Sequence, residues 1–126
     1  MRKLIAALAL GWMLLSGTTP ASAHAQLVSA NPKAKSVLYA LPTQIKLMFS
    51  DDLIDLDGGN QIQVVDPKGR RIDSGANSLL GNQLSTGLKR SNLLGRYSVT
   101  YRVLSEDGHP VSANYYFTLA KKPKQK

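Results

Sequence analysis

The sequence predicts an all-β protein, a β-sandwich or Greek-key barrel of about seven short strands. Apolar residues alternate with polar ones along several segments, which is typical of strands with one buried face. Turn signals rich in Pro, Gly, Asn and Asp recur between these segments. No window keeps the 3.6-residue period of an amphipathic helix, although residues 77–80 are compatible with a short helical turn. Many short strands at regular spacing favour a sandwich or a barrel.

Three segments alternate clearly enough to be predicted as half-buried strands of an antiparallel sheet. In residues 44–50 the apolar face carries Ile45, Leu47 and Phe49. Residues 96–103 and 111–119 alternate in the same way. Weaker strand candidates are residues 27–30, 61–65, 70–73 and 84–88, and the turn Asp66-Pro67-Lys68-Gly69 predicts a hairpin between two of them.

The first 23 residues have the layout of a cleaved secretory signal peptide. Met1-Arg2-Lys3 is basic, residues 4–15 are apolar, and residues 16–23 are small and polar and end in Ala21-Ser22-Ala23. The apolar stretch has about 12 residues, fewer than the roughly 20 that a membrane-spanning helix needs. We therefore expect residues 24–126 to form one exported domain that begins at His24 and does not span a membrane.

The composition excludes several classes of function. The chain has no cysteine, so the exported domain can form neither a disulfide nor the thiolate-containing blue-copper centre of electron-transfer proteins. Loss of Arg2 and Lys3 with the leader lowers the formal net charge from +8 to +6, part of which lies in the basic tail at residues 121–126. Such a tail is usually a solvated end and favours at most weak attraction to an anionic membrane. No aromatic-and-basic motif indicates nucleic-acid binding.

Two histidines and a nearby aspartate form the candidate metal site. Cleavage after Ala23 would give His24 a free α-amine, and this amine and the ring Nδ1 can close a six-membered chelate around one ion. His109, the other histidine of the chain, would add a third nitrogen. If residues 107–109 form a strand, Asp107 faces the same side as His109, two positions further on. It could then supply an oxygen ligand to the ion or orient an imidazole. A nitrogen-rich, tetragonal set favours copper(II), although the pattern alone does not exclude nickel or zinc.

A simpler interpretation leaves the same residues without a metal. His24 would then follow the cleavage point by chance and lie in solvent, and Asp107-Gly108 would be no more than a turn. The metal interpretation requires the first segment after the leader to lie beside the loop before residues 111–119. Gly108 allows the backbone to bend between the two candidate ligands, and Pro110 restricts His109 to extended conformations.

Four segments carry a resemblance to a known family. They are HAQLVSANP at residues 24–32, IKLMFSD at residues 45–51, SEDGHPVS at residues 105–112, and YFTL at residues 116–119. They resemble, in this order, the mature start, an early strand, a late motif and the closing strand of the CopC copper-resistance family of periplasmic copper-binding proteins. The similarity extends over nearly all of residues 24–126.

The resemblance implies a seven-stranded, Greek-key, cupredoxin-like or Ig-like β-sandwich that binds one copper(II) ion per chain. Its metal ligands would be His24, Asp107 and His109. In some members the acidic residue after Phe-Ser adds a contact, and the matching position here is Asp51, one methylene shorter than the glutamate of some relatives. Other members bind copper(I) in a methionine-rich loop, but Met48 is the sole methionine of residues 24–126. Because soft copper(I) prefers several sulfur ligands, we expect a copper(II)-only protein.

The expected function is copper binding in the periplasm without catalysis, as a buffer or chaperone in copper homeostasis and resistance. The resemblance also implies delivery of copper to a separate CopD-like inner-membrane transport protein, by analogy with the family. Two other interpretations stay open: a copper monooxygenase with an N-terminal histidine brace, and a metal-free Ig-like interaction module. The monooxygenase needs a broad, often aromatic substrate surface, which residues 24–126 supply poorly because they contain no tryptophan.

Overall fold

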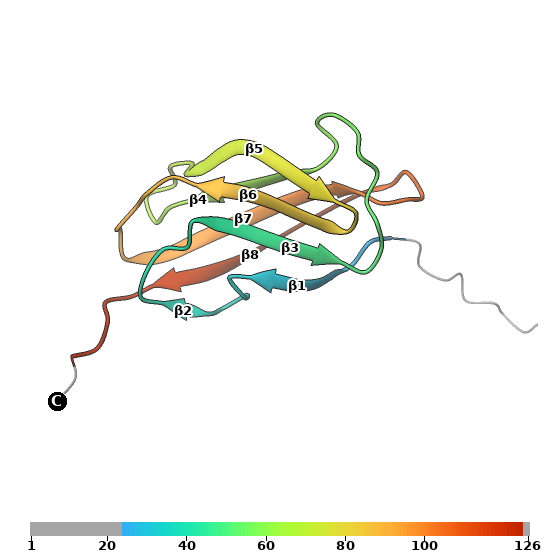
Figure 1. Cartoon of the computed structure of the whole chain (residues 1–126). Helices are drawn as coiled ribbons and strands as arrows, with labels where there is room; N and C mark the ends of the chain where they lie inside the picture. The colour runs from blue at the N-terminus through green and yellow to red at the C-terminus, as the bar shows by residue number, and fades with distance from the viewer. Residues whose placement is uncertain (1–23, 125–126) are drawn as a thin grey trace, which may run out of the picture.

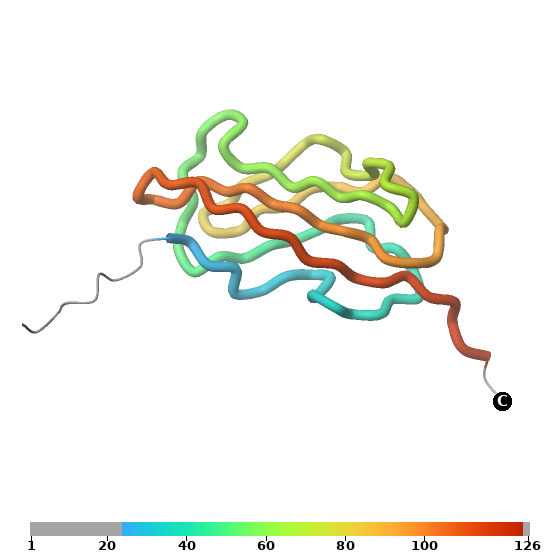
Figure 2. Tube along the Cα trace, turned by 180° about the vertical axis from the view of Figure 1, so that it is seen from behind, coloured from blue at the N-terminus to red at the C-terminus, as the bar shows by residue number. Residues whose placement is uncertain are grey.

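The computed structural model describes residues 24–124 as two four-stranded β-sheets packed face to face (Figure 1, Figure 2). One sheet has the order β1-β3-β6-β5 and the other β2-β8-β7-β4. The predicted all-β sandwich is confirmed, with eight strands in place of about seven.

The described residues contain no helix that could cross a membrane, and the expected leader at residues 1–23 lies outside them. The strands are β1 (Leu27–Asn31), β2 (Val37–Leu38), β3 (Gln44–Phe49), β4 (Gln61–Val65), β5 (Asp73–Leu80), β6 (Gln83–Leu88), β7 (Gly95–Leu104) and β8 (Pro110–Leu119).

Alternation along the strands builds the core between the two sheets. β3 buries Ile45, Leu47 and Phe49 and exposes the residues between them, as predicted. The facing sheet contributes the buried side chains Tyr97, Val99, Tyr101, Val103, Phe117 and Leu119. β7 and β8 pair along their whole length, from Gly95 opposite Leu119 to Leu104 opposite Pro110. This long antiparallel pair fixes the position of the loop between them at one end of the sandwich.

The turn predicted at residues 66–69 is present, but it joins strands that belong to different sheets. Ile72 N donates a hydrogen bond to Val64 O at 2.9 Å, so the chain forms only a short hairpin. β4 then stays with β7, while β5 pairs with β6 in the other sheet. β5 therefore begins at Asp73, three residues later than predicted. Residues 77–80 are strand and not a helical turn, because they pair with β6.

Side chains of β5 close the free edge of β4. Asp73 Oδ1 accepts a hydrogen bond from Val64 N at 2.9 Å, and Asn77 Oδ1 accepts one from Ile62 N at 3.0 Å. Arg71 Nη2 lies 2.7 Å from Asp73 Oδ2. Burial raises the pKa of Asp73, but hydrogen bonds from Arg71 and from Val64 N outweigh it and hold the pKa below its usual value. The ionised carboxylate thus provides the acceptor that this sheet edge needs.

Replacement of Asp73 by alanine is expected to lower the free energy of unfolding by about 2 kcal/mol, because the N–H of Val64 loses its acceptor. The folded-state pKa of Asp73 lies below that of the unfolded chain. Its contribution to stability is therefore present above about pH 4 and is lost as the pH falls through the folded-state pKa. Urea unfolding from neutral pH down to about pH 2 measures both effects.

The matched control for this experiment is Asp57→Asn, on an exposed loop. Asp73→Asn keeps an acceptor oxygen but removes the charge, so part of the acid-dependent loss of stability should disappear in this variant. A wild-type pH dependence in Asp73→Asn would contradict the assignment.

Candidate metal centre

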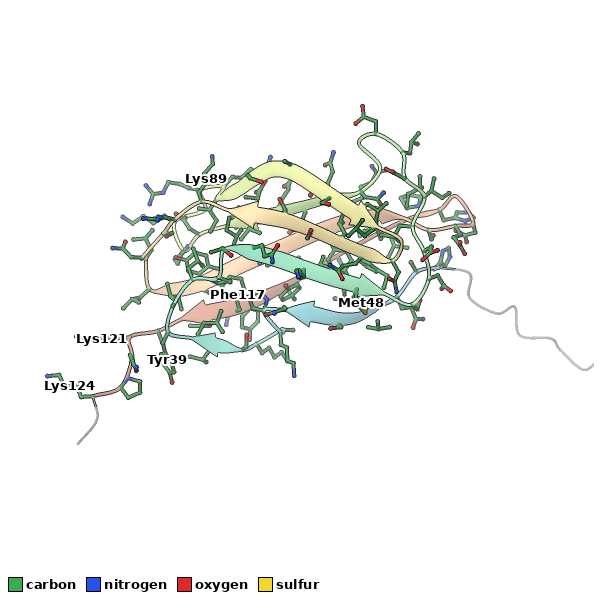
Figure 3. The ribbon with its side chains drawn as sticks, in the orientation of Figure 1. Tyr39, Met48, Lys89, Phe117, Lys121 and Lys124 are labelled. Carbon is green, nitrogen blue, oxygen red and sulfur yellow. The ribbon has the colours of Figure 1, made fainter. Side chains whose placement is uncertain are left out.

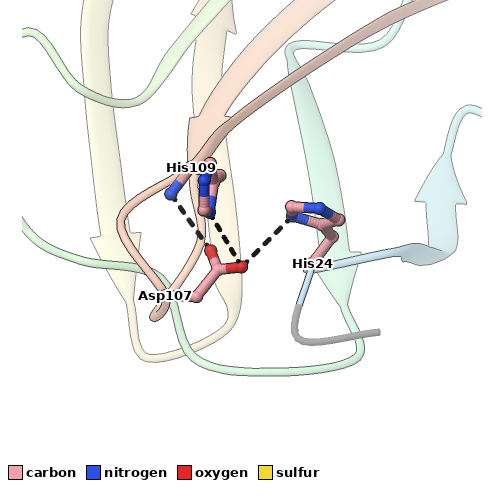
Figure 4. Close-up of side chains that lie close together, drawn as sticks. All are labelled: His24, Asp107 and His109. Carbon is pink, nitrogen blue, oxygen red and sulfur yellow. Dashed lines mark hydrogen bonds and ion pairs between the residues drawn. The ribbon is translucent and has the colours of Figure 1, made fainter. Parts of the chain in front are cut away.

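His24, Asp107 and His109 meet at one end of the sandwich. His24 lies just before β1, and the other two residues lie in the loop that joins β7 to β8. Both overall views show the start of the described chain beside this loop (Figure 1, Figure 2). Figure 4 shows the three side chains turned toward one another. The arrangement that the metal interpretation requires is therefore present in the structure.

The backbone just after His24 fixes the position of this histidine. The Ala25 side chain is buried, with 1% exposure. Gln26 N donates a hydrogen bond to the Ser50 hydroxyl at 3.0 Å, and Ser50 N donates one to Gln26 O at 2.8 Å. β1 then pairs with β3. The imidazole of His24 thus extends from a segment that is held to the body of the domain one residue later.

A tight turn, and not a strand, brings Asp107 and His109 to the same side. Ser105 N donates a hydrogen bond to His109 O at 3.1 Å, and Gly108 N donates one to Ser105 O at 2.8 Å. Gly108 has a φ of 85°, a left-handed conformation that glycine adopts without steric cost. The expectation of strand spacing between the two residues is wrong because the chain reverses here. The predicted bend at Gly108 is confirmed.

The Asp107 carboxylate links this turn to both imidazoles. Its Oδ1 accepts hydrogen bonds from the Ser105 hydroxyl at 2.7 Å and from His109 N at 3.0 Å. Its Oδ2 lies 3.3 Å from His24 Nδ1 and 3.1 Å from His109 Nδ1. The backbone N–H of His109, and then the Ser105 hydroxyl, lower the pKa of Asp107 to about 2. The carboxylate is therefore ionised at neutral pH and offers only acceptor oxygens.

The geometry suits one small cation. Three ligand atoms, one from each of His24, Asp107 and His109, all lie within 4.8 Å of one another. With metal–nitrogen distances of about 2.0 Å, two ligand atoms of one ion lie roughly 3 to 4 Å apart, so small side-chain rotations would bring the three together. The two imidazoles are 51% and 69% exposed, which leaves the site open to an incoming ion.

Asp51, the optional fourth ligand, is not part of this group of atoms. Its carboxylate is exposed and accepts a hydrogen bond from the Ser50 hydroxyl at 3.0 Å. Among the described residues, Asp51 forms no hydrogen bond or ion pair with His24, Asp107 or His109. A role for Asp51 in metal binding stays a prediction.

Ser105 is a residue of this site that sequence reasoning missed. It is completely buried, with 0% exposure. Its hydroxyl lies 2.7 Å from Asp107 Oδ1 and 2.7 Å from the carbonyl oxygen of His109. Serine and aspartate side chains commonly hydrogen-bond to nearby backbone groups in turns. The serine two positions before Asp107 is the local signal that could have identified it.

Replacement of Ser105 by alanine is expected to weaken metal binding by about 10- to 100-fold, the usual cost of removing a partner that orients a ligand. Asp107 would keep the hydrogen bond from His109 N but lose the one from the hydroxyl. Competition titration with a chelator measures the affinity, and a thermal melt separates this effect from unfolding. The control is Ser112→Ala, an exposed position on β8. Equal affinities for both variants would exclude a positioning role for Ser105.

Two curated relatives are similar to this chain over most of its length. Copper resistance protein C of Escherichia coli is 28% identical over 118 residues, which cover 86% of this chain and 91% of that protein. Copper transport protein CutJ of Bacillus subtilis strain 168 is 28% identical over 102 residues, which cover 79% of this chain but 18% of CutJ.

Solved structures share the fold. CopC from Methylosinus trichosporium OB3b superimposes with a TM-score of 0.69 at 28% identity, covering 82% of this chain and 100% of that one. PcoC from Escherichia coli, a methionine-rich copper resistance protein, superimposes with a TM-score of 0.63 at 26% identity, covering 77% of this chain and 99% of that one. The family model of the CopC domain matches residues 27–120, a segment that contains Asp107 and His109 and begins shortly after His24. The chain therefore belongs to the CopC family.

Proposed function

We propose that this protein is exported to the periplasm, where it binds one copper(II) ion and buffers or chaperones it. The convergence of His24, Asp107 and His109 at one end of the sandwich carries the proposal. The cargo ion would be held by the α-amine and Nδ1 of His24 and by the ring of His109. Asp107 would either bind the ion or orient an imidazole. Such a nitrogen-rich set favours copper(II) among the divalent metals.

The names of the relatives support copper as the cargo. One is a copper resistance protein, and another is a copper transport protein. The segment of CutJ that matches this chain is 18% of that transport protein, so most of CutJ lies outside the similarity. We propose that a separate membrane transport protein of the CopD type receives the copper from this protein.

The sulfur content supports a protein for copper(II) alone. PcoC is described as methionine-rich, whereas Met48 is the one methionine of residues 24–124. Met48 lies on β3 and is 40% exposed (Figure 3). A single thioether cannot assemble the set of soft ligands that copper(I) prefers.

The test is a copper(II) titration of protein recovered from the periplasm, with mass spectrometry and copper EPR on the same sample. We expect a chain that begins at His24, one bound ion per chain, and an EPR signal coupled to nitrogens. Binding no tighter than that of a generic histidine peptide would contradict the proposal and favour a metal-free interaction module. Formation of oxidised oligosaccharides in the presence of a reductant and oxygen would overturn the non-catalytic role in favour of a monooxygenase.

A further inference from the structure

The two ends of the sandwich differ in charge among the described residues. The metal-site end carries the acidic residues Asp51, Asp52, Asp55, Asp57, Glu106 and Asp107, and the segments 50–60 and 105–109 contain no lysine or arginine. The opposite end carries six exposed cationic residues, which we call the basic pole: Lys68, Lys89, Arg90, Lys121, Lys122 and Lys124. None of the six forms an ion pair with a described residue, whereas Arg70 and Arg71 nearby are each paired with an aspartate.

Three separate segments bring the basic pole together. Lys89 N donates a hydrogen bond to Ile72 O at 2.7 Å, which holds the loop after β6 against the turn between β4 and β5. β8 ends beside the start of β7, so the tail leaves the domain at the same end. Figure 3 shows Lys89, Lys121 and Lys124 at this end, far from the loop that carries the metal site. The pole is therefore one surface formed by folding, and not a run of sequence.

Apolar side chains lie among the basic ones at this end. Tyr39 is 54% exposed, and Leu94 is 57% exposed (Figure 3 labels Tyr39 beside the tail). An open depression of about 520 Å³ is lined by Leu41, Pro42 and Leu88 together with Lys89 and Arg90. Cationic side chains interspersed with aromatic and aliphatic ones are typical of surfaces that contact the headgroup region of anionic membranes.

We propose that the basic pole docks on a membrane surface of anionic phospholipids and holds the metal site at the far end. Cations from three segments match a diffuse negative surface better than they match one small anion. The acidic end is repelled by the same surface, so the charge distribution also orients the molecule. The ten-residue strands β7 and β8, at about 3.3 Å per residue, would place the metal site roughly 30 Å from the headgroups. Lipid phosphates would then not compete for the ion.

The test is co-sedimentation of the metal-free protein, recovered from the periplasm, with phosphatidylcholine vesicles that contain or lack phosphatidylglycerol. Its outcome is therefore independent of copper binding. We expect binding only to the anionic vesicles, and weaker binding as the salt concentration rises. The triple variant Lys121→Glu, Lys122→Glu, Lys124→Glu should bind the anionic vesicles at least about 100-fold more weakly. Each lysine near an anionic membrane contributes about 1 kcal/mol to binding, and this variant loses three of them.

The matched control is the triple variant Lys33→Glu, Lys46→Glu, Arg102→Glu, which changes the net charge equally but at exposed positions outside the basic pole. We expect it to lose less than about threefold, because these side chains are not part of the basic pole and solvent-exposed charges are screened by salt with increasing distance. An equal loss in the two triple variants, or no binding to anionic vesicles, would overturn the proposal. Salt-sensitive self-association in place of vesicle binding would also overturn it and assign the basic pole to the acidic end of a second copy.

The orientation can be tested separately, because the chain has no cysteine and a single engineered one can be labelled cleanly. A fluorophore at Leu94→Cys should be quenched by a lipid-borne quencher, and one at Glu106→Cys should not. The reverse pattern would contradict the proposed orientation.

Discussion

A form of the protein with one extra methionine before His24 is expected to bind copper(II) at least about 100-fold more weakly than the form that begins at His24, a larger loss than removal of an orienting partner usually causes. The added peptide bond converts the α-amine into an amide, which is a poor ligand while it keeps its proton. The ring Nδ1 would still face Asp107 Oδ2 at 3.3 Å, but the six-membered chelate would be lost. Competition titration against a chelator of known affinity measures the difference.

The companion variant is His24→Ala in the form that begins at position 24, which keeps the amine and removes the ring. Mass spectrometry of each sample must establish the first residue. Similar losses in the two forms would indicate that amine and imidazole act as one chelating unit. An unchanged affinity in the extended form would exclude the α-amine as a ligand.

Replacement of His109 by alanine is expected to remove one nitrogen from the copper EPR signal and to lower the affinity by about 100-fold or more. The His109 ring lies 3.1 Å from Asp107 Oδ2 and can reach the same ion. The backbone N–H at position 109, which holds Asp107 Oδ1, is retained in the variant. The turn should therefore keep its shape, and the loss reports the imidazole itself.

Glu106→Ala is the matched control for this experiment, because Glu106 is an exposed acidic residue of the same loop. An EPR spectrum with an unchanged nitrogen coupling pattern in His109→Ala would exclude His109 as a ligand. Asp51→Asn, measured in the same series, tests the optional fourth contact. A spectrum unlike that of the wild type would support Asp51 as a fourth ligand.

Three strands were predictable because one of their faces is buried, and the sequence then alternates between apolar and polar residues. β3, β7 and β8 show that pattern, and each lies where the alternation predicts. β2 has two residues, Val37–Leu38, too few to show any period, and it exists because it pairs in parallel with the end of β8. β5 is an edge strand with mostly exposed residues, so its last four residues carried no alternating signal.

The candidate site was predictable where its ligands can be recognised from neighbouring residues in the sequence. A histidine after a predicted cleavage point and an aspartate two positions from a second histidine are visible in the sequence. Local patterns do not show that the start of β1 lies beside the β7–β8 loop, since strand order in the two sheets decides it. The strand spacing expected between Asp107 and His109 was wrong, because a turn forms there. The hydrogen bond of the Ser105 hydroxyl and the positive φ of Gly108 define this turn.

The burial of Ala25 leaves almost no free length between the folded body and the proposed new chain end at His24. A cut displaced by one residue would move the terminal nitrogen by about 3.3 Å, as far as the gap between His24 Nδ1 and Asp107 Oδ2. Cleavage by the processing enzyme would thus be the step that completes the binding site. A precursor still inside the cytoplasm, with its leader attached, would lack the nitrogen that completes the chelate and would bind copper(II) more weakly. Full affinity for copper(II) would arise only after the leader is removed.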